Sequence, residues 1–478
     1  MTAQTMIKGF LLVLLLYFLY VVVTAVVLFY FLKEKEEDRP IKHISAYLGE
    51  KDSTVDRVLL LEDGYESGLA RMRMIQEAQH SIDIAYYAFG KGKSCELILG
   101  ALFEAADRGV KVRILLDGIS HGLRGQLSGV RYALASHENI ELRYYETFKP
   151  FKPWTWHNRL HDKMITTDGK LGIIGGRNIA DKYLAKNANA PKNYVYDRDV
   201  LIFNAEQEKD SVIVEMKAYI HELWTHPYTS KVFADLSKRQ KAQGKSVRDT
   251  LLNQYSKAMQ KNADFVNPSI DWSKSTTPTK KVSFIYNPIE RFNKHPFVWR
   301  SLVDIAANAN KSVFIQSPYI VPTGPMKEYV PKNMNSKADW TILTNSVTST
   351  PNVIAFSGYL ALRDSIVKTG AKLYEYSKLH SLHGKSAVYD QRLSAVGSFN
   401  LDSRSAFLNT ESMVIIDSEN FATQLIGAIE SKISGSTLVA ENKRYIEPPE
   451  DQKKEKSFFK ATFLNVLSKI TVYWKRFI

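Results

Sequence analysis

The chain has 478 residues, 45% of them hydrophobic, which is enough to form the core of one large two-part domain or of two ordinary domains. Its formal net charge of +14 favours an anionic partner, either nucleic acid or an anionic membrane surface. The single cysteine, Cys95, excludes an intrachain disulfide, a thiolate zinc cage and an iron–sulfur cluster built from this chain alone.

The first predicted element is a transmembrane helix. Residues 9–32 carry no charged side chain, and a helix of that length is about 36 Å long, whereas a bilayer core is about 30 Å thick. A secretory signal peptide is the alternative. However, the apolar stretch is long and runs directly into the charged residues 33–38 without a small-residue cleavage site. We therefore expect residues 1–55 to form a retained single-pass anchor in the cell membrane and a juxtamembrane segment.

The basic residues around this helix predict its orientation. Lys8 is the only basic side chain before it, whereas five follow it within about 20 residues: Lys33, Lys35, Arg39, Lys42 and Lys51. Because basic residues are enriched on the cytoplasmic side, the globular part is expected in the cytoplasm.

The remainder of the chain repeats one plan of helices and strands. Strands are predicted at residues 81–89 and 110–118 in the first copy, and at residues 312–322 and 340–346 in the second. These strands are nearly continuous apolar runs with helices between them, which is typical of an α/β sheet covered on both faces. We expect two pseudo-symmetric halves.

The boundaries of the halves follow from composition. Residues 56–261 are predicted as the first half and residues 282–445 as the second. Residues 262–281 are rich in Ser, Thr, Pro, Asn and Lys and are predicted as an exposed linker. Residues 446–478 are left as a basic C-terminal tail.

Each half contains the pattern His-x-Lys-x4-Asp. It is formed by His161, Lys163 and Asp168 in the first half and by His383, Lys385 and Asp390 in the second. A polar turn and a second strand follow each pattern and end at Asn178 or Asn400, 15 residues after the lysine in both halves. Each half is therefore expected to present a β-hairpin, and coincidence is an improbable explanation for the equal spacing.

These residue types suit a phosphodiester. On a strand, a histidine and the lysine two positions later point to the same face, so two hairpins around a pseudo-twofold axis would surround one anion. A neutral imidazole can attack phosphorus, while a protonated one gives its proton to the leaving oxygen. The groups predicted to hold the non-bridging oxygens are Lys163, Lys385, Asn178 and Asn400. Asp199 and Glu411 are predicted to orient the histidines by accepting the other ring N–H.

The remaining polar residues of the motifs are assigned more modest roles. Asp168 and Asp390 belong to the catalytic motif, but they fall on the opposite strand face and are expected to secure the hairpin turns. His157 and His380 lie close enough in sequence to the motif histidines to suggest a metal. There is no thiolate cluster and no His-Glu-x-x-His pattern, so we predict no metal and no other cofactor.

The duplicated motif resembles that of the phospholipase D superfamily. The residues that carry the resemblance are the two His-x-Lys-x4-Asp patterns and the downstream segments 175–178 and 397–400, and the resemblance covers roughly residues 56–441. It implies one active site formed from both halves, a covalent phosphohistidine and no required metal. It also implies that His161 is the nucleophile and His383 the general acid.

Two longer segments resemble bacterial cardiolipin synthases, particularly those that can use phosphatidylethanolamine as the phosphatidyl donor. These are residues 175–183 and 397–411, although Ser403 stands where proline is common, and Ala180 and Lys182 replace a usual Gly and Glu. The resemblance implies transfer of a phosphatidyl group to phosphatidylglycerol. Hydrolysis of phospholipids to phosphatidic acid, a membrane-bound nuclease and a non-catalytic lipid-binding scaffold remain the alternatives.

The C-terminal tail is predicted to be a basic amphipathic helix. In residues 453–478, aromatic and aliphatic side chains recur at helical spacing with lysines and an arginine around them. Such a helix suits an anionic bilayer surface, and the alternative is a helix docked on the protein's own core. The expected partners are therefore phospholipids and an anionic membrane surface rather than nucleic acid.

Overall fold

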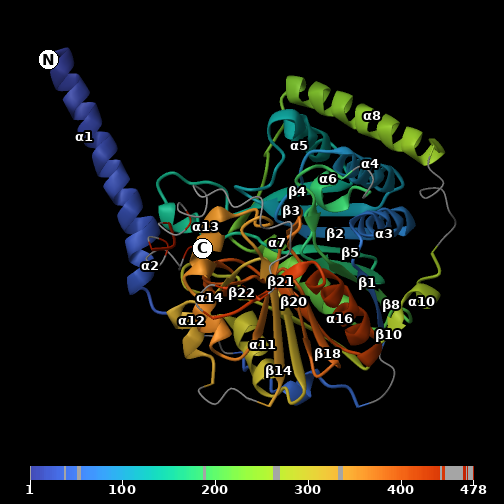
Figure 1. The fold of residues 1–478 in the computed structure, drawn as a ribbon. Helices are drawn as coiled ribbons and strands as arrows, with labels where there is room; N and C mark the ends of the chain where they lie inside the picture. The colour runs from blue at the N-terminus through green and yellow to red at the C-terminus, as the bar shows by residue number, and fades with distance from the viewer. Residues whose placement is uncertain are drawn as a thin grey trace.

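The computed structural model describes residues 2–36, 39–50, 55–186, 190–261, 270–331, 337–441 and 444–446, together with 464, 467–469, 471 and 477. Two nine-stranded mixed sheets lie at its centre, flanked by helices, and a long N-terminal helix extends away from them (Figure 1). The predicted α/β fold with a duplicated plan is confirmed.

The first half forms one of the sheets. Its strands, in spatial order, are β10 (Thr277–Pro278), β1 (Asp56–Leu61), β8 (Asp199–Asn204), β6 (Leu171–Gly175), β5 (Lys163–Thr167), β2 (Ser81–Tyr86), β3 (Lys111–Asp117), β4 (Ile140–Tyr145) and β9 (Thr229–Lys231). Strands β2, β3 and β4 are parallel to one another, while the other neighbours pair antiparallel.

The second sheet repeats this order from β1 onward with its own strands and adds one strand at the far end, so β10 has no counterpart in it. Its strands are β11 (Lys281–Tyr286), β20 (Ser412–Asp417), β18 (Leu393–Gly397), β17 (Ser386–Tyr389), β12 (Ser312–Gln316), β14 (Asp339–Asn345), β15 (Lys372–Tyr376), β21 (Ser436–Val439) and β22 (Tyr445–Ile446). Here β12, β14 and β15 form the parallel group. The hairpin β5–β6 of the first half therefore corresponds to the hairpin β17–β18 of the second.

The two sheets share one inner core, and each has its own outer layer. Along a strand, apolar side chains alternate between the inner core and the outer layer. On β6, Ile173 joins the outer core of the first half and Ile174 joins the inner core. Helices α7 (Val212–Thr225) and α16 (Glu419–Ile433) complete the inner core. The outer layer of the first half contains α3 (Gly64–Glu77), α4 (Lys93–Asp107), α5 (Ser128–Ala135), α6 (Asp181–Leu184) and α8 (Lys238–Lys261).

The outer layer of the second half has two parts. Helices α11 (Phe297–Ala307), α12 (Gly324–Glu328) and α15 (Ser403–Phe407) cover one part. Helices α13 (Val353–Leu360) and α14 (Arg363–Val367) cover the other.

The N-terminal apolar segment is a single helical rod. It consists of α1 (Ala3–Val22), a π-helical turn (Val23–Val27) and α2 (Leu28–Phe31), and it is long and apolar enough to cross a membrane. Its N-terminal part projects from the body (Figure 1), whereas its end is part of the fold. Phe29 is buried in the outer core of the second half, and the Asn293 side chain donates hydrogen bonds to the carbonyls of Phe29 and Leu32.

Part of the predicted linker packs on the first half. Within residues 262–281, α10 (Trp272–Ser275) and β10 pack on the first half. Trp272 holds this part against the first half: its side chain is buried, and its Nε1 donates to Glu77 Oε2 at 2.8 Å. Residues 262–269 lie outside the described residues.

Most of the predicted C-terminal amphipathic helix lies outside the described residues, including all of 447–463. Three of its described positions contact the protein itself. Leu464 belongs to an outer core of the second half, Thr471 accepts a hydrogen bond from Ser357, and the Phe477 ring packs on Phe29. These contacts favour docking on the protein at those three positions.

Candidate active site

Both motifs form hairpins whose turns require unusual backbone angles. The turn of β5–β6 contains Asp168 at φ 54° and Gly169 at φ 69°, and that of β17–β18 contains Asp390 at φ 52° and Gln391 at φ 59°. Two consecutive positive φ angles are typical of the two-residue turns that match the twist of a hairpin. Aspartate tolerates this conformation because its side chain is short and polar.

The carboxylates of Asp168 and Asp390 bind backbone N–H groups, not the histidines. Asp168 accepts from Gln79, His80 and Ser81 at 2.7 to 2.9 Å. Asp390 accepts in the same way from Asn310, Lys311 and Ser312. Each motif aspartate therefore ties the turn of its hairpin to the start of the neighbouring strand, at the end of β5 or β17 remote from the histidine. These contacts are those of residues that secure the hairpin turns, the role expected from the sequence.

We expect Asp168→Ala to destabilise the protein without impairing its chemistry. The change removes the acceptor of three backbone N–H groups, which costs about 2 kcal/mol because hydrogen bonds to a charged group are stronger than neutral ones. Thermal unfolding should show a lower midpoint, while kcat of the folded enzyme stays close to that of the wild type. An unchanged midpoint with a large loss of kcat would instead place Asp168 in the reaction.

Each histidine is held by the opposite half of the chain. Leu160 forms a parallel bridge with Thr410, and the His161 N–H donates to the Thr410 carbonyl at 3.3 Å. Correspondingly, β16 (Ser381–Leu382) pairs with β7 (Val195–Tyr196), and the His383 N–H donates to the Tyr196 carbonyl at 2.6 Å. The two halves thus exchange backbone contacts immediately before both histidines.

The residue after each of these carbonyls is a buried acid that contacts the histidine ring. His161 Nδ1 lies 2.8 Å from Glu411 Oε1, and His383 Nδ1 lies 2.6 Å from Asp197 Oδ2. A carboxylate in this position holds the ring proton on Nδ1 and leaves Nε2 for the substrate. Both acids are fully buried, while each histidine side chain keeps 14% of its surface exposed.

Asp197, not Asp199, occupies the place predicted for the second orienting acid. Asp199 Oδ2 accepts from Arg71 Nη2 at 2.9 Å, from Arg177 Nη1 at 3.2 Å and from a serine hydroxyl, inside the first half. The reason is the register of the sheets, which pairs Gly175 with Asp199 but Gly397 with Met413. Asp199 therefore corresponds to Met413, and Asp197, two positions earlier, corresponds to Glu411.

The motif lysines fold back on their own histidines. Lys163 Nζ donates to the His161 carbonyl, and Lys385 Nζ donates to the His383 carbonyl and lies 3.9 Å from Asp197 Oδ2. Both side chains are buried. Burial lowers the pKa of Lys163 to about 7 and that of Lys385 to about 8, so both ammonium groups are poised near neutral pH.

The two histidine–carboxylate pairs differ electrostatically. Burial, followed by Lys163, holds the pKa of His161 well below its usual value, and burial raises the pKa of Glu411 to about 7. Burial and Lys385 lower the pKa of His383 to about 4. Burial alone would raise the pKa of Asp197, but Lys385 and His383 bring it down to about 2. His383 therefore faces an ionised carboxylate, which stabilises a protonated imidazole better than the more neutral Glu411 does.

Asn178 and Asn400 lie just after the second strands of the hairpins, and their side chains are almost fully buried. The Oδ1 atom of each has no hydrogen-bond partner among the described residues. A carbonyl oxygen does not bind a phosphate oxygen, because both are acceptors, so the Nδ2 donor of each asparagine is the group that would contact a phosphate. Their role as phosphate ligands stays a prediction.

Sequence reasoning did not find several neighbours of the histidines. The ring of Tyr87 lies 5.1 Å from that of His161, and the ring of Tyr183 lies 5.9 Å from that of His383. Arg404 also lowers the pKa of His161. No spacing relates these residues to the motifs, although Tyr183 lies within a segment singled out above.

The other two histidines near the motifs contact protein groups. His157 Nε2 lies 2.7 Å from the Ala25 carbonyl, and the His380 ring packs against Tyr194 and Tyr196. In the described part of the chain, no group of three or more His, Cys, Asp or Glu side chains is arranged to hold a metal ion.

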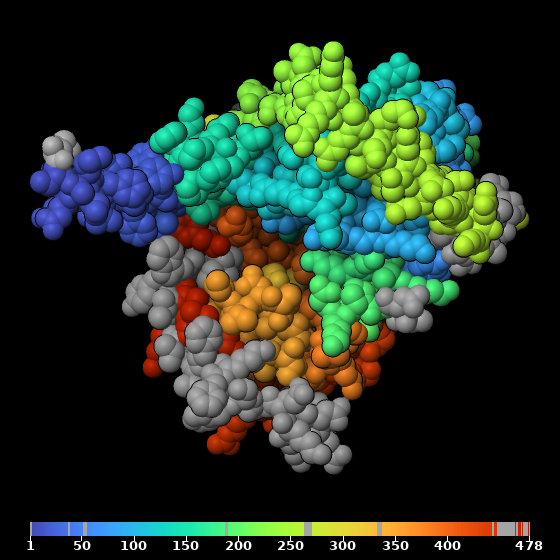
Figure 2. All heavy atoms as spheres, turned by 90° about the horizontal axis from the view of Figure 1, so that it is seen from above, coloured from blue at the N-terminus to red at the C-terminus, as the bar shows by residue number. Residues whose placement is uncertain are grey.

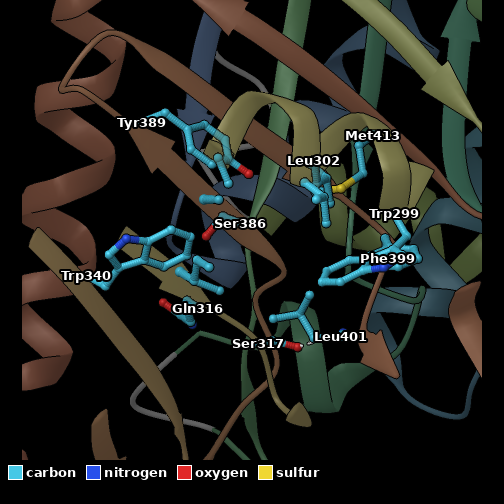
Figure 3. Close-up of a pocket in the computed structure, with 14 residues that line it drawn as sticks. Trp299, Leu302, Gln316, Ser317, Trp340, Ser386, Tyr389, Phe399, Leu401 and Met413 are labelled. Atoms are coloured by element: carbon cyan, nitrogen blue, oxygen red, sulfur yellow. Dashed lines mark hydrogen bonds between the residues drawn. The ribbon is translucent and has the colours of Figure 1, made fainter. Parts of the chain in front are cut away.

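An apolar cavity of about 60 Å³ lies behind the second motif (Figure 3). Leu302 and Trp340 line it, and Ser386 and Leu401 join it to the residues that follow Lys385 and Asn400.

Comparison with known proteins identifies the family. A family model described as "Cardiolipin synthase, PLD-like domain" matches residues 72–224 and 302–433, so each match contains one motif. The chain belongs to this phospholipase D-like family. The protein is therefore a phospholipase D-family enzyme related to cardiolipin synthases.

Individual relatives extend this result. The enzyme is 31% identical to an uncharacterized protein of Helicobacter pylori (strain ATCC 700392 / 26695), over 81% of each chain. It is 28% identical to cardiolipin synthase C of Escherichia coli (strain K12), over 77% of this chain and 82% of that one. The structure of phosphatidylserine synthase from Haemophilus influenzae Rd KW20 superimposes with a TM-score of 0.60 at 15% identity, covering 88% and 95% of the chains, which shows the shared fold.

Proposed function

We propose that this enzyme is a phosphatidyltransferase that makes cardiolipin from phosphatidylglycerol and a phospholipid donor. The observation that carries the proposal is the reciprocal arrangement of His161 with Glu411 and His383 with Asp197, each pair drawn from both halves. Two imidazoles with their Nδ1 atoms fixed can act in turn on one phosphorus atom. Relatives named as cardiolipin synthases support the choice of substrate.

The proposed reaction has two displacements. His161 Nε2 attacks the donor phosphorus, and His383 Nε2–H protonates the leaving alkoxide, which gives a phosphohistidine and the free headgroup alcohol. His383 then accepts the proton of the phosphatidylglycerol hydroxyl, whose oxygen attacks the phosphohistidine and releases His161. Lys163, Lys385 and the two motif asparagines hold the non-bridging oxygens in both steps.

The assignment of His161 as nucleophile rests on the difference between the two pairs. A nucleophilic imidazole must be neutral, and burial keeps the pKa of His161 well below its usual value. The general acid must hold a proton. Burial and Lys385 lower the pKa of His383 to about 4 in the free enzyme, so its protonation in the reaction depends on the ionised Asp197 and on the bound phosphate anion, both of which favour the charged imidazolium.

We also propose that the N-terminal helix is a retained membrane anchor, with the catalytic part on the cytoplasmic side. The burial of Phe29 in the core of the second half supports retention, because cleavage after the apolar segment would remove part of that core. An anchored site would lie at the headgroups of an anionic membrane, where its phospholipid substrates are.

The experiment that tests the proposal is mass spectrometry of lipids after incubation with the purified full-length enzyme. Phosphatidylglycerol is supplied alone and together with phosphatidylethanolamine, and His161→Ala is the control. Cardiolipin formed only by the intact enzyme supports the transferase, and a requirement for phosphatidylethanolamine would identify the donor. Phosphatidic acid alone would show a phospholipase. No lipid product in either mixture would contradict lipid chemistry and favour a nuclease.

We expect kcat/KM to fall as the pH rises through about 7 to 8. Burial lowers the pKa values of Lys163 and Lys385 to about 7 and 8, so the free enzyme loses the two ammonium groups on the alkaline side of these values. The fall of kcat should occur at a higher pH than the fall of kcat/KM, because a bound phosphate anion raises the pKa values of both lysines. An alkaline limb of kcat/KM near the ordinary lysine pKa would contradict this account.

A further inference from the structure

The loop that leads from β4 to His161 presents aromatic side chains to its surroundings. This loop, residues 147–157, is called the Phe148 loop. Phe148 is 54% exposed and Phe151 is 75% exposed, and two lysines, Lys149 and Lys152, lie between and beside them. Large aromatic side chains at a loop tip are costly to leave in water, which indicates a partner surface.

The Phe148 loop is held in shape by its own contacts. Trp156 Nε1 donates to the Lys149 carbonyl at 2.9 Å, and the Trp156 ring stacks on Phe148 with centroids 5.1 Å apart. At its base, Arg159 Nη2 donates to the Glu146 carbonyl at 2.9 Å. The exposed aromatic tip is therefore presented by a closed, preformed loop.

The loop lies directly against the N-terminal apolar helix. Tyr17 and Tyr20 donate hydrogen bonds from their hydroxyls to the carbonyls of Pro150 and Phe151, at 2.9 and 2.7 Å. Nearer the body, His157 contacts the Ala25 carbonyl in the π-helical turn. Figures 1 and 2 show the loop beside the part of the projecting helix that joins the body.

The position of these contacts along the helix decides where the loop lies. Between the charged Lys8 and these contacts lie only the uncharged residues 9–16, and eight helical residues are about 12 Å long. A hydrocarbon core is about 30 Å thick, so a helix that crosses it must have Tyr17 within the bilayer. The carbonyls bonded to Tyr17 and Tyr20 are then at membrane depth too.

We propose that the tip of the Phe148 loop is embedded in the membrane leaflet on which the catalytic part sits, with Phe148 and Phe151 among the acyl chains. This inference rests on the proposed membrane anchoring. In hydrocarbon an unpaired backbone carbonyl is strongly unfavourable, because no water can bind it, and the tyrosine hydroxyls of the helix satisfy two such groups. Pro150 and Pro153 carry no N–H, and Lys149 and Lys152 can reach anionic headgroups through their long side chains.

The embedded loop would set the height of the active site above the bilayer. Three residues after the loop comes Leu160, whose N–H donates to Asp117 Oδ2 at 3.1 Å, and Arg159 forms an ion pair with the same carboxylate. These buried contacts fix the chain between the loop and His161. A loop inserted to a set depth would therefore hold His161 at a set distance from the headgroup phosphates.

The depth of the loop can be measured directly. The full-length protein with Cys95→Ala carries one new cysteine, labelled with the fluorophore NBD, in vesicles of phosphatidylcholine and phosphatidylglycerol. The labelled variants are Phe151→Cys, Phe10→Cys in α1, and Lys274→Cys in α10, which lies across the body from α1 in Figure 1. We expect acyl-chain spin labels to quench the probes at 151 and 10, and aqueous iodide to quench the probe at 274.

The outcomes separate this inference from the proposed anchoring. Lipid quenching at position 10 but iodide quenching at position 151 would overturn the embedded loop while leaving the anchor intact. Iodide quenching at both positions would overturn the anchor, and the embedded loop with it.

A second measurement tests the effect on catalysis. We expect Phe148→Asp with Phe151→Asp to lower kcat/KM about tenfold on vesicles, because the charged tip no longer inserts, and to leave the rate on short-chain soluble phosphatidylglycerol unchanged. Lys274→Asp is the matched surface control and should alter neither rate. An equal loss on both substrates, or no loss on vesicles, would contradict the proposal.

Discussion

Replacing either motif histidine by asparagine is expected to lower phosphatidyl transfer by at least about 10²-fold. His161→Asn removes the nucleophile, so the phosphohistidine cannot form. His383→Asn removes the proton donor of the first displacement and the base of the second, and such a group typically contributes about 10²- to 10⁴-fold. The double variant should be scarcely worse than either single one, because the two residues act on the same reaction steps. Product formation on phosphatidylglycerol vesicles measures all three.

The matched control for these variants is His80→Asn. His80 is an exposed histidine before β2, and it binds Asp168 through its backbone N–H rather than its ring. Its replacement should leave both the rate and the unfolding midpoint close to the wild-type values. A rate for His161→Asn or His383→Asn within tenfold of the wild type would contradict the two-histidine reaction and favour the lipid-binding scaffold.

The two aspartates Asp197 and Asp199 should give opposite results, although they are only two residues apart. Asp197→Asn is expected to reduce kcat by about 10²- to 10⁴-fold, because an amide no longer stabilises protonated His383 or fixes its ring tautomer. The loss should persist at every pH at which the protein stays folded. Steady-state kinetics together with thermal unfolding measure the effect.

Asp199→Asn is expected to act on stability instead. Asp199 is the buried partner of Arg71 and Arg177, both of which are fully buried. Removing one partner of a buried ion pair costs about 3–5 kcal/mol, so the unfolding midpoint should fall sharply while kcat of the remaining folded enzyme changes little. The reverse pattern, with Asp199 needed for kcat and Asp197 only for folding, would show that the assignment of the orienting acid is wrong.

The duplicated fold was predictable because its signals are local. Apolar runs of strand length, separated by helices, occur in the same order in both halves, and the structure contains two sheets with corresponding strand orders. Hairpin turns at Asp168 and Asp390 follow from residues that tolerate positive φ. Glu411, which contacts His161, also agrees with the sequence prediction of an acid beside a motif histidine.

Features that depend on register or on contacts between distant segments were not predictable in this way. Asp197 and Asp199 are two positions apart, a spacing that puts two residues of one strand on the same face, and only the pairing of β6 with β8 shows which of them corresponds to Glu411. Trp272 packs on the first half, although the polar composition of its segment predicted an exposed linker. Contact between Tyr17 and the Phe148 loop joins residues 133 positions apart, which no local pattern indicates.

The most direct test of the central claim is to trap the phosphatidyl group on the enzyme. A phosphatidyl ester of nitrophenol is mixed with His383→Ala, because nitrophenolate leaves without a proton donor while the second step still lacks its base. We expect one equivalent of nitrophenolate per active site and, by mass spectrometry at neutral pH, a phosphatidyl group on the peptide that contains His161. His161→Ala should give neither. An adduct at another residue, or release without any adduct, would contradict the phosphohistidine mechanism.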